Sequence, residues 1–363
     1  MVWAMASPLL RLVVLYGGVS AEHDVSCVTA AHVLAAADRS KYDLVPIGIT
    51  KSGTWLRNDK AIAALAEGSD LPERLEPAGT EVEPLAAIRG EGTDQAITVV
   101  LPLLHGPHGE DGTIQGMLEL FKVPYVGAGV LSSALCMDKA MAKIVAEQAG
   151  IPQCRWVEFR DGIDDPNEIV TRAVAELGLP VFVKPANLGS SVGITKAHDA
   201  AELDKAVDLA LRYDDVVIIE EAVTAREVEV AVLGNAAPEA SVPGEIVPGS
   251  EFYDYEDKYV TGAAQLVIPA DLPDDVTREV RELAAKGFTA LRCAGMARVD
   301  FFYEAEGRGW LLNEVNTIPG FTPASMYPKL WEATGISYPD LIDQLVALAL
   351  DSHRRRVGFS TEH

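Results

Sequence analysis

The chain has 363 residues, a length that predicts two or three domains. Hydrophobic residues make up 48% and charged residues 23%, a composition typical of folded globular proteins that excludes global disorder. The 54 acidic and 30 basic residues give a net charge of −24, which repels phosphate backbones and anionic lipid. Nucleic acid and membrane surfaces are therefore excluded as expected partners, whereas a small anionic ligand in a locally basic pocket is not.

The cysteines and the apolar runs indicate the compartment. The four cysteines lie far apart and form no C-x-x-C pair, which favours a reducing environment over a disulfide framework. No apolar run approaches the roughly 18 to 20 residues that span a bilayer. The N-terminal stretch has no basic residue before Arg11 and does not resemble a signal peptide. We expect a cytoplasmic globular protein.

The first third of the chain alternates strand and helix patterns. Strands are predicted at 12–16, 44–50 and 97–101, and helices at 24–37 and 112–121. Ser20 or Asp24 is the predicted N-cap of the first helix. This order predicts a doubly wound parallel sheet, with ligands beyond the carboxyl ends of the strands, where Gly17 and His105 lie. The mixed-charge stretch 59–95 is interpreted as surface elaboration.

A second pattern begins near residue 138. Helices are predicted at 139–149, 167–177, 200–211, 274–291 and 339–350, with strands at 180–185 and 216–219. From Glu227 the apolar period changes to two, which predicts further strands. The cluster Arg354-Arg355-Arg356 is interpreted as a solvated tail that complements the C-terminus of the last helix. The order is α/β first and α+β afterwards.

Two strands near the end carry a candidate metal site. Strand alternation places Arg298 and Asp300 on one face, and Glu314 and Asn316 on one face of the next strand. A hairpin centred on Gly307 would set Asp300 opposite Glu314, and Arg298 opposite Asn316. Two carboxylates and an amide oxygen suit Mg²⁺, which completes its coordination with water and phosphate. A surface salt-bridge cluster remains the alternative.

A lysine and a loop form a candidate phosphate site. Lys184 emerges from a buried strand, and the glycine- and serine-rich turn 187–193 follows it. Such a loop offers backbone N–H groups to phosphate oxygens. Neither a Walker P-loop nor a Rossmann G-x-G-x-x-G motif is present, so a plain surface loop remains the alternative.

A third group of carboxylates follows the strand at 216–219. Glu220, Glu221 and Glu227 are placed to meet an adenine edge and ribose hydroxyls, and solvated negative charge is the alternative. The occurrence of lysine, phosphate loop, nucleotide edge and metal carboxylates in this order predicts an ATP- and Mg²⁺-dependent enzyme. His105 and His108 do not make a zinc site by themselves, and no G-x-S-x-G nucleophile elbow is present.

Several motifs together carry a resemblance that covers residues 12–350. They lie at 17–26, 104–106, 109–112, 133–139, 183–185, 189–193, 252–259, 297–300, 313–320 and 325–326. The chain resembles the D-alanine–D-alanine ligases of the ATP-grasp superfamily. The resemblance implies an α/β and α+β protein with an ATP-grasp fold preceded by an N-terminal Rossmann-like doubly wound domain. It implies domains at 1–137, 138–225 and 226–363, with ATP held between the last two.

The resemblance also implies roles for individual residues. The ATP contacts would be Lys139, Lys184, Ser190, Ser191, Glu220, Glu221, Val223 and Glu227, and the metal ligands Asp300, Glu314 and Asn316. The catalytic residues would be Glu22, Ser190, Tyr259, Arg298 and Gly320. The substrate would contact Glu22, His105, Lys258, Arg298, Ser325 and Met326. Among these, Glu22 would hold the ammonium of the first D-alanine, and Arg298 with the backbone at Gly320 would steady charge at the carbonyl.

The implied reaction is the ATP-dependent joining of two D-alanines through an acyl phosphate, for peptidoglycan precursor synthesis. ATP and Mg²⁺ or Mn²⁺ are the expected cofactors, a monovalent cation is left open, and a homodimer is expected. Tyr259 would favour D-alanine over D-lactate as second substrate through hydrogen bonds by way of Ser190 to Glu22. A ligase for D-lactate or another second substrate, a silent nucleotide-binding regulator and a dehydrogenase are the alternatives. Glu221 and His23 depart from the residues frequent in the family, Lys and Arg.

Overall fold

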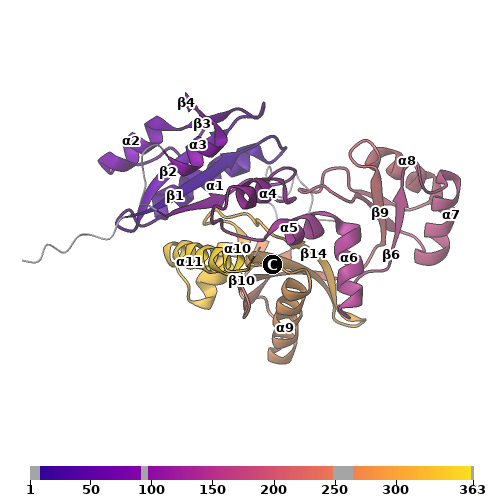
Figure 1. Cartoon of the computed structure of the whole chain (residues 1–363). Coiled ribbons are helices and arrows are strands. Elements are labelled where there is room, and N and C mark those ends of the chain that lie inside the picture. The colour runs from indigo at the N-terminus through magenta and orange to yellow at the C-terminus, as the bar shows by residue number, and fades with distance from the viewer. Residues whose placement is uncertain (1–8, 91–96, 248–264, 361–363) are drawn as a thin grey trace, which may run out of the picture.

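The protein is described by a computed structural model of residues 9–90, 97–247 and 265–360. Within these residues the chain folds around three β-sheets that follow one another along the sequence (Figure 1). The mixed α/β and α+β class predicted from the sequence is confirmed.

The N-terminal sheet has the strand order β4-β3-β2-β1-β5. Its strands are β1 (Leu10–Gly17), β2 (Tyr42–Ile49), β3 (Trp55–Arg57), β4 (Thr80–Glu81) and β5 (Thr98–Pro102). Strand β1 pairs in parallel with β2 and β5, so their carboxyl ends meet at one edge as predicted. Strands β3 and β4 are antiparallel additions. The predicted parallel sheet is confirmed for β2, β1 and β5, and β3 is antiparallel because the chain reverses directly after β2. The stretch 59–95, interpreted as surface elaboration, contains two helices and β4 in its described part.

In the described residues, the helices that accompany the N-terminal sheet are α1 (His23–Ala36), α2 (Asp59–Glu67), α3 (Pro84–Arg89) and α4 (Thr113–Leu120). The N-cap of α1 is Glu22, and its side chain makes no capping hydrogen bond. The prediction of Ser20 or Asp24 is wrong, because the Ser20 hydroxyl accepts from the Glu22 N–H at 3.1 Å and Asp24 lies in the first turn. The Glu22 carboxylate is thus left for contacts outside its helix.

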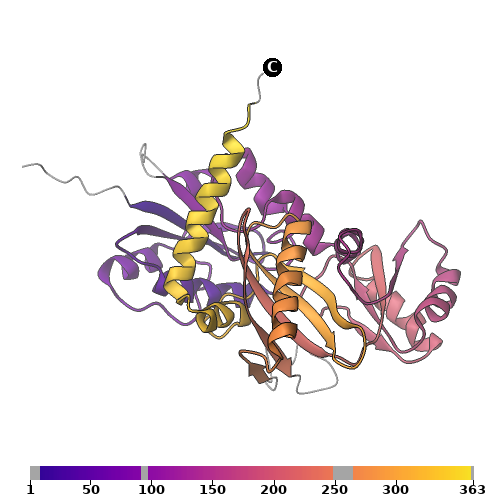
Figure 2. The same ribbon diagram turned by 90° about the horizontal axis from the view of Figure 1, so that it is seen from below.

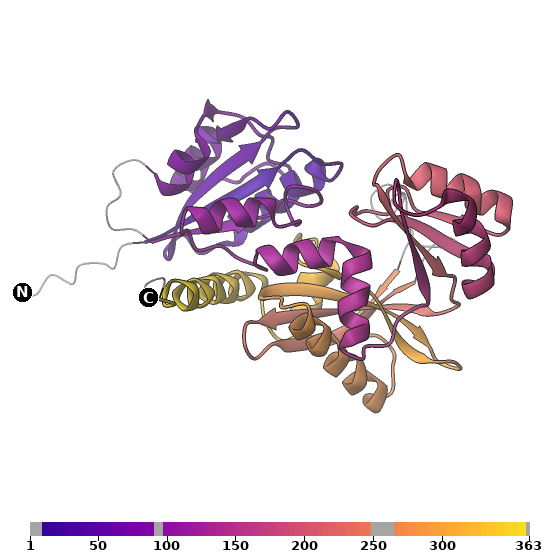
Figure 3. The same cartoon turned by 45° about the vertical axis from the view of Figure 1, so that its right-hand side comes forward.

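The central sheet has the order β6-β9-β7-β8, with antiparallel neighbours throughout. Its strands are β6 (Trp156–Arg160), β7 (Val181–Pro185), β8 (Thr195–Ala197) and β9 (Val216–Glu221). Helices α7 (Pro166–Leu177) and α8 (Ala200–Ala210) cover one face, as Figure 3 shows. Alternate strand residues such as Phe159 and Ile219 form one core with Leu203 of α8, as strand periodicity requires.

The C-terminal sheet has the order β12-β11-β10-β13-β14. Its strands are β10 (Arg226–Gly234), β11 (Glu239–Val247), β12 (Gln265–Val267), β13 (Gly295–Glu304) and β14 (Gly309–Asn316). Helix α9 (Asp274–Ala290) packs on one face, and α10 (Met326–Thr334) and α11 (Tyr338–Val357) lie on the other (Figure 2). Leu345 of α11 shares a core with Leu34 of α1, so α11 joins the N-terminal domain to this sheet.

Two helices link the N-terminal domain to the central sheet: α5 (Val130–Met137) and α6 (Lys139–Gln148). The sequence predicted α6 but not α5. Cys136 and Ala146 from these helices belong to the core formed by α9 and β13, so both helices pack beside the C-terminal sheet. The predicted domain boundaries after residues 137 and 225 stay predictions.

The end of the chain differs from the prediction. Helix α10 was not predicted, and α11 continues to Val357, so the arginine cluster lies in its last turn and not in a tail. Arg356 stacks on Tyr125 at 4.8 Å from the ring centre, and its Nε lies 3.1 Å from Glu119. These contacts, together with the attraction between the arginine charges and the negative C-terminal end of the helix dipole, stabilise the additional turns of the helix. None of the helices in the described ranges has both the length and the hydropathy of a membrane span.

Candidate functional site

The hairpin of β13 and β14 has the predicted register at its polar end. Asp300 pairs with Glu314, and Arg298 pairs with Asn316, which confirms the prediction. Beyond Asp300 the register shifts by one residue, because Phe301 pairs with Leu312 and Asn313 is the extra residue of a bulge. On the turn side of the bulge the strands pair one residue out of the predicted register. The bulge restores that register, so that the carboxylates of Asp300 and Glu314 lie on directly opposing residues.

Asp300 is the centre of the candidate metal site. It is 6% exposed, which argues against a surface salt-bridge cluster. Its carboxylate accepts hydrogen bonds from Arg298 at 2.8 and 2.7 Å and from Asn316 Nδ2 at 2.9 Å. Rotation of the Asn316 amide would present Oδ1 instead of Nδ2. The donor set of two carboxylates and one amide oxygen then fits a hard divalent cation.

Arg298 is held between two carboxylates. Its Nε lies 3.0 Å from Glu229 Oε2, and it makes the bidentate pair with Asp300. Burial lowers the pKa of Arg298, but the charges of Asp300 and Glu229 outweigh it and raise the pKa well above its ordinary value. Arg298 is therefore a permanent, oriented cation beside the metal site. Glu229 was not predicted as a site residue, although a carboxylate within the otherwise apolar run 228–233 of β10 is a recognisable signal.

Three charged residues form a buried cluster next to the glycine- and serine-rich loop. Glu220 lies 2.8 Å from Lys184 Nζ and 3.2 Å from Lys143 Nζ. Burial alone would raise the pKa of Glu220, but the charges of Lys143 and Lys184 lower it to about 2. Lys143 was not predicted, although it lies one helical turn after Lys139 on α6.

The two predicted phosphate lysines lie in different surroundings. Burial lowers the pKa of Lys184, but the charge and hydrogen bond of Glu220 prevail and raise it. Burial lowers the pKa of Lys139, whose Nζ donates to the Leu188 carbonyl at 2.5 Å. Lys139 thus ties α6 to the loop, and Lys184 Nζ reaches Asn313 Oδ1 at 3.5 Å on the metal-site hairpin. The two lysines lie between the loop and the candidate metal ligands.

The loop of the central sheet meets the N-terminal domain at Glu22. The Ser190 hydroxyl donates a hydrogen bond to Glu22 Oε1. A Cβ atom at Gly106 or Gly189 would lie 3.1 Å from Glu22 Oε2, so both glycines permit a close approach. Ser190 and Ser191 have φ of 51° and 59°. Left-handed backbone at two consecutive serines stores strain of the kind that collects at functional sites.

His105 and Glu110 both adjoin Gly106, the glycine that approaches Glu22. His105 is 6% exposed, and its Nδ1 lies 3.0 Å from the Ile318 carbonyl. Within the described ranges its buried Nε2 has no hydrogen-bond partner, which suits a ligand contact. Glu110 accepts from the Gly106 N–H at 2.8 Å, and burial together with the charge of Glu22 raises its pKa to about 8. Glu110 lies in the motif at 109–112, but no individual role was predicted for it.

The predicted second-substrate residues gather at the start of α10. Ser325 is the N-cap of α10, and Met326 is its first residue. The Ser325 hydroxyl accepts from the Thr322 N–H at 3.1 Å and lies 3.1 Å from where a Cβ atom of Gly320 would be. The structure therefore places Ser325 beside Gly320 and directly before Met326, and the roles of these residues stay predictions.

The predicted adenine contacts separate into two groups. Glu220 faces the lysine cluster, whereas Glu221 accepts from Arg155 Nε at 2.8 Å and from Arg308 Nη1 at 2.5 Å. Burial raises the pKa of Glu221, but hydrogen bonds from Arg155 and Arg308 outweigh it and lower the pKa. The Glu221 side chain is thus committed to two arginines. Val223 lies between β9 and β10, and Glu227 is the second residue of β10.

Two predicted site residues lie outside the described residues. They are Tyr259 and Lys258, together with the rest of the motif at 252–259. Their roles stay predictions.

Comparisons with known proteins agree with this geometry. Family models described as D-ala D-ala ligase N-terminus and C-terminus match residues 11–128 and 145–347. A D-alanine–D-alanine ligase of Thermoanaerobacter sp. is 48% identical over 351 residues, which cover 95% of this chain and 98% of the relative. A D-alanine–D-alanine ligase of Bacillus licheniformis is 47% identical over 354 residues, which cover 95% of this chain and 97% of the relative.

Solved structures are similar over the same length. The D-alanine-D-alanine ligase from Coxiella burnetii has a TM-score of 0.81 and 38% identity, over 96% of each chain. The VanG D-Ala:D-Ser ligase from Enterococcus faecalis has a TM-score of 0.81 and 36% identity, over 94% of this chain and all of that one. The ATP-grasp fold of these ligases confirms the predicted fold. On sequence and structure together, the chain belongs to the D-alanine–D-alanine ligase family.

Proposed function

We propose that this protein is an ATP-dependent, ADP-forming ligase that joins two D-alanines into D-alanyl-D-alanine for peptidoglycan precursor synthesis. Membership of the ligase family supports the reaction. The contact between Ser190 and Glu22 is the structural observation that carries it, because it joins the phosphate loop to the substrate-side helix. A substrate carboxylate and the γ-phosphate of ATP would meet at this junction.

The chemistry requires activation of a carboxylate. Oxide is too poor a leaving group for an amine to displace, so the γ-phosphoryl group is first transferred to the carboxylate to give an acyl phosphate. The amine of the second D-alanine then attacks the carbonyl, and phosphate leaves. Such a transfer depends on positioning and on neutralisation of charge more than on a protein nucleophile.

Residues of this chain supply the fixed charges. Lys139 and Lys184 bind ATP phosphates, and Arg298 steadies the charge that develops at the carbonyl. The bidentate pair with Asp300 keeps the Arg298 guanidinium in one orientation. Asp300, Glu314 and Asn316 would hold Mg²⁺ or Mn²⁺. The bound ion would supply positive charge that neutralises the phosphate groups.

The substrate-side residues orient the two amino acids. Glu22 receives the ammonium group of the first D-alanine, and Ser325 with Met326 binds the second. The backbone at Gly320 helps Arg298 to steady the charge at the carbonyl. The loop carrying Ser190 excludes water from the acyl phosphate, which hydrolyses readily. Tyr259, which lies outside the described residues, would favour an amine over a hydroxyl acceptor by acting through Ser190 on Glu22. If Tyr259→Phe leaves the preference for D-alanine over D-lactate unchanged, this last role is excluded.

The second substrate has one specific alternative. The VanG structure, titled a D-Ala:D-Ser ligase, is as similar to this chain by TM-score as the Coxiella burnetii ligase. D-serine is therefore the second candidate acceptor, and D-lactate is the third.

Phosphate release with Mg²⁺-ATP tests the function, with product mass determined alongside. The substrates compared are D-alanine, L-alanine, D-alanine plus D-serine, and D-alanine plus D-lactate. We expect phosphate and dipeptide from D-alanine alone and nothing from L-alanine. If the product with D-serine or D-lactate predominates, that compound is the second substrate. ATP binding without turnover on any substrate would favour a silent regulator.

Three further features belong to this proposal. The reaction takes place in the cytoplasm, where ATP is supplied. The protein acts as a homodimer, as the family resemblance implies, and sedimentation analysis would reveal a monomer if this is wrong. Activity requires Mg²⁺ or Mn²⁺, and comparison of potassium with sodium buffers shows whether a monovalent cation contributes.

A further inference from the structure

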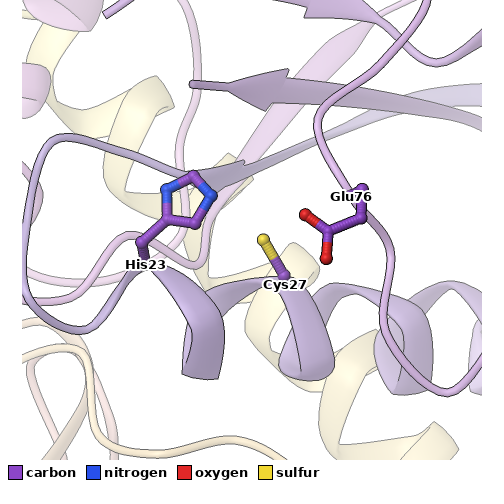
Figure 4. A group of neighbouring side chains, drawn as sticks. All are labelled: His23, Cys27 and Glu76. Carbon is purple, nitrogen blue, oxygen red and sulfur yellow. The ribbon is translucent and has the colours of Figure 1, made fainter. Parts of the chain in front are cut away.

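Three side chains of metal-ligating types, outside the set of proposed active-site residues, lie close together near the start of α1. His23 and Cys27 are four residues apart on α1 and project from the same face of the helix. Glu76 approaches them from the segment between α2 and β4, as Figure 4 shows. One ligand atom from each residue lies within 4.8 Å of the other two. His23 and Cys27 are 4% and 0% exposed.

The histidine is already oriented for coordination. Its Nδ1 lies 2.7 Å from the Gly18 carbonyl, which can only accept a hydrogen bond. Nδ1 therefore carries the proton, and Nε2 keeps its lone pair on the side of Cys27 and Glu76 (Figure 4). Metal-binding histidines typically donate their other N–H to a carbonyl or carboxylate in this way.

The segment that carries Glu76 is held against α1 by its backbone. The Leu75 N–H donates to the Cys27 carbonyl at 3.1 Å. The Glu76 carbonyl accepts from Tyr16 Oη at 3.3 Å and from Asn58 Nδ2 at 3.2 Å. The Glu76 side chain is 60% exposed and can move, while its backbone is anchored. The backbone of Glu76 is therefore held in place, while its carboxylate can move towards a bound ion.

We propose that His23, Cys27 and Glu76 form a binding site for a Zn²⁺-class transition-metal ion. Imidazole nitrogen, thiolate sulfur and carboxylate oxygen are the donors that Zn²⁺ selects, whereas Asp300, Glu314 and Asn316 offer hard oxygens alone. Ligands at about 2.0 to 2.3 Å on a tetrahedral ion are roughly 3.5 Å apart, so a modest closure completes the site. Three protein ligands leave the fourth position to water.

Binding has a defined proton and charge balance. Burial and the charge of Glu76 raise the pKa of the Cys27 thiol to about 12, so the thiol is protonated before the ion arrives. Formation of the metal–sulfur bond displaces that proton to solvent, and thiolate and carboxylate together offset the two positive charges. Arg74 Nε, 2.6 Å from Glu76 Oε1, releases the carboxylate and keeps its contact with Asp24 at 2.8 Å.

The position of the site gives it a consequence for the fold. His23 follows Glu22 directly at the start of α1. An ion held by both α1 and the segment of Glu76 would fix the first turn of the helix, and with it the backbone of Glu22. We therefore expect the ion to raise the thermal stability of the protein.

Cobalt titration of the full-length protein in excess Mg²⁺ tests the proposal, because Mg²⁺ occupies the hard-oxygen site and Co²⁺ reports on sulfur. We expect one equivalent of Co²⁺ to give a thiolate-to-cobalt charge-transfer band and to release about one proton, and Zn²⁺ to displace it. Cys27→Ser should abolish the band. Glu76→Gln, a change at an exposed side chain that leaves folding intact, should weaken binding at least tenfold.

Control variants at other cysteines and at another histidine test whether cobalt binds at this site. His32→Gln on the same helix and Cys154→Ser, another buried cysteine, should bind cobalt like the unmodified chain. The sulfurs of Cys136 and Cys293 lie 3.7 Å apart, so Cys136→Ser is the third control. A band that survives Cys27→Ser and disappears in Cys136→Ser would overturn the proposal. Absence of any band, or affinity unchanged in Glu76→Gln, would do so as well.

Discussion

The hydroxyl of Ser190 donates a hydrogen bond to the carboxylate of Glu22, 168 positions earlier in the chain. Ser190 lies in the loop between β7 and β8 of the central sheet, and Glu22 is the N-cap of α1 in the N-terminal domain. The loop that would cover the ATP phosphates is therefore closed onto the residue that would hold the first substrate. This contact couples closure of the loop to the substrate end of the site.

Glu22→Gln should separate the two roles of this residue. The amide still accepts a hydrogen bond from Ser190, but it no longer offers a negative charge to an ammonium group. A hydrogen bond to a charged group contributes about 1.5 to 3 kcal/mol, so kcat/KM for D-alanine should fall about 10- to 100-fold. Phosphate-release kinetics at varied D-alanine measure the change. A kcat/KM equal to that of the unmodified protein would show that Glu22 does not bind the substrate.

Arg298→Lys should preserve the charge beside the metal site and lose its geometry. An ammonium cannot make the bidentate pair with Asp300 and reach Glu229 in the same fixed orientation. Loss of an oriented electrostatic contact of this kind lowers kcat by about 10²- to 10³-fold. The KM for ATP is measured in parallel and should change much less. An equal rise in that KM would indicate a role in nucleotide binding instead.

Glu220→Gln should destabilise the protein strongly. The variant leaves Lys143 and Lys184 buried without their shared carboxylate, and breaking a buried pair costs about 3 to 5 kcal/mol. Urea denaturation at neutral pH measures the loss of unfolding free energy. Glu147→Gln, an exposed change on the same helix as Lys143, is the matched control and should be near neutral.

The pH dependence of stability provides a second test of Glu220. Its pKa is about 2 in the folded protein against an ordinary value of 4.5. A lowered carboxyl pKa contributes stability that is fully present above the unfolded pKa and is lost as pH falls towards the folded pKa. Between about pH 4.5 and 2 the unmodified protein should therefore lose stability more steeply than Glu220→Gln. Parallel curves for the two proteins would contradict the pairing.

Glu110 should have the opposite effect on stability. Its pKa of about 8 lies above the ordinary 4.5, so the folded protein keeps a proton that the unfolded chain has released. Stability then falls as pH rises between those two values. Glu110→Gln mimics the protonated form and should flatten the decline between pH 5 and 8. Urea unfolding across this range measures the slope, and an unchanged slope would show that Glu110 is ionised in the fold.

Local sequence patterns were sufficient to predict many of the strands and helices and the opposing pairs of the metal-site hairpin. The alternation in β13 and β14 places Asp300 and Glu314 on facing strands, because side-chain direction in a strand depends only on position along it. The strands of the parallel core and α1, α6, α8 and α9 were predictable for the same reason: apolar periodicity is a property of neighbouring residues. The family motifs also predicted the type of reaction.

Local patterns could not predict which distant groups share a buried environment. The bulge at Asn313, the pairing of Glu229 with Arg298 and the proximity of Glu76 to Cys27 join separate segments. Periodicity carries no information on such contacts, since they depend on how sheets and helices pack against each other. The raised pKa of Glu110 and the lowered pKa of Glu220 follow from that packing, because both require burial and a particular charged neighbour.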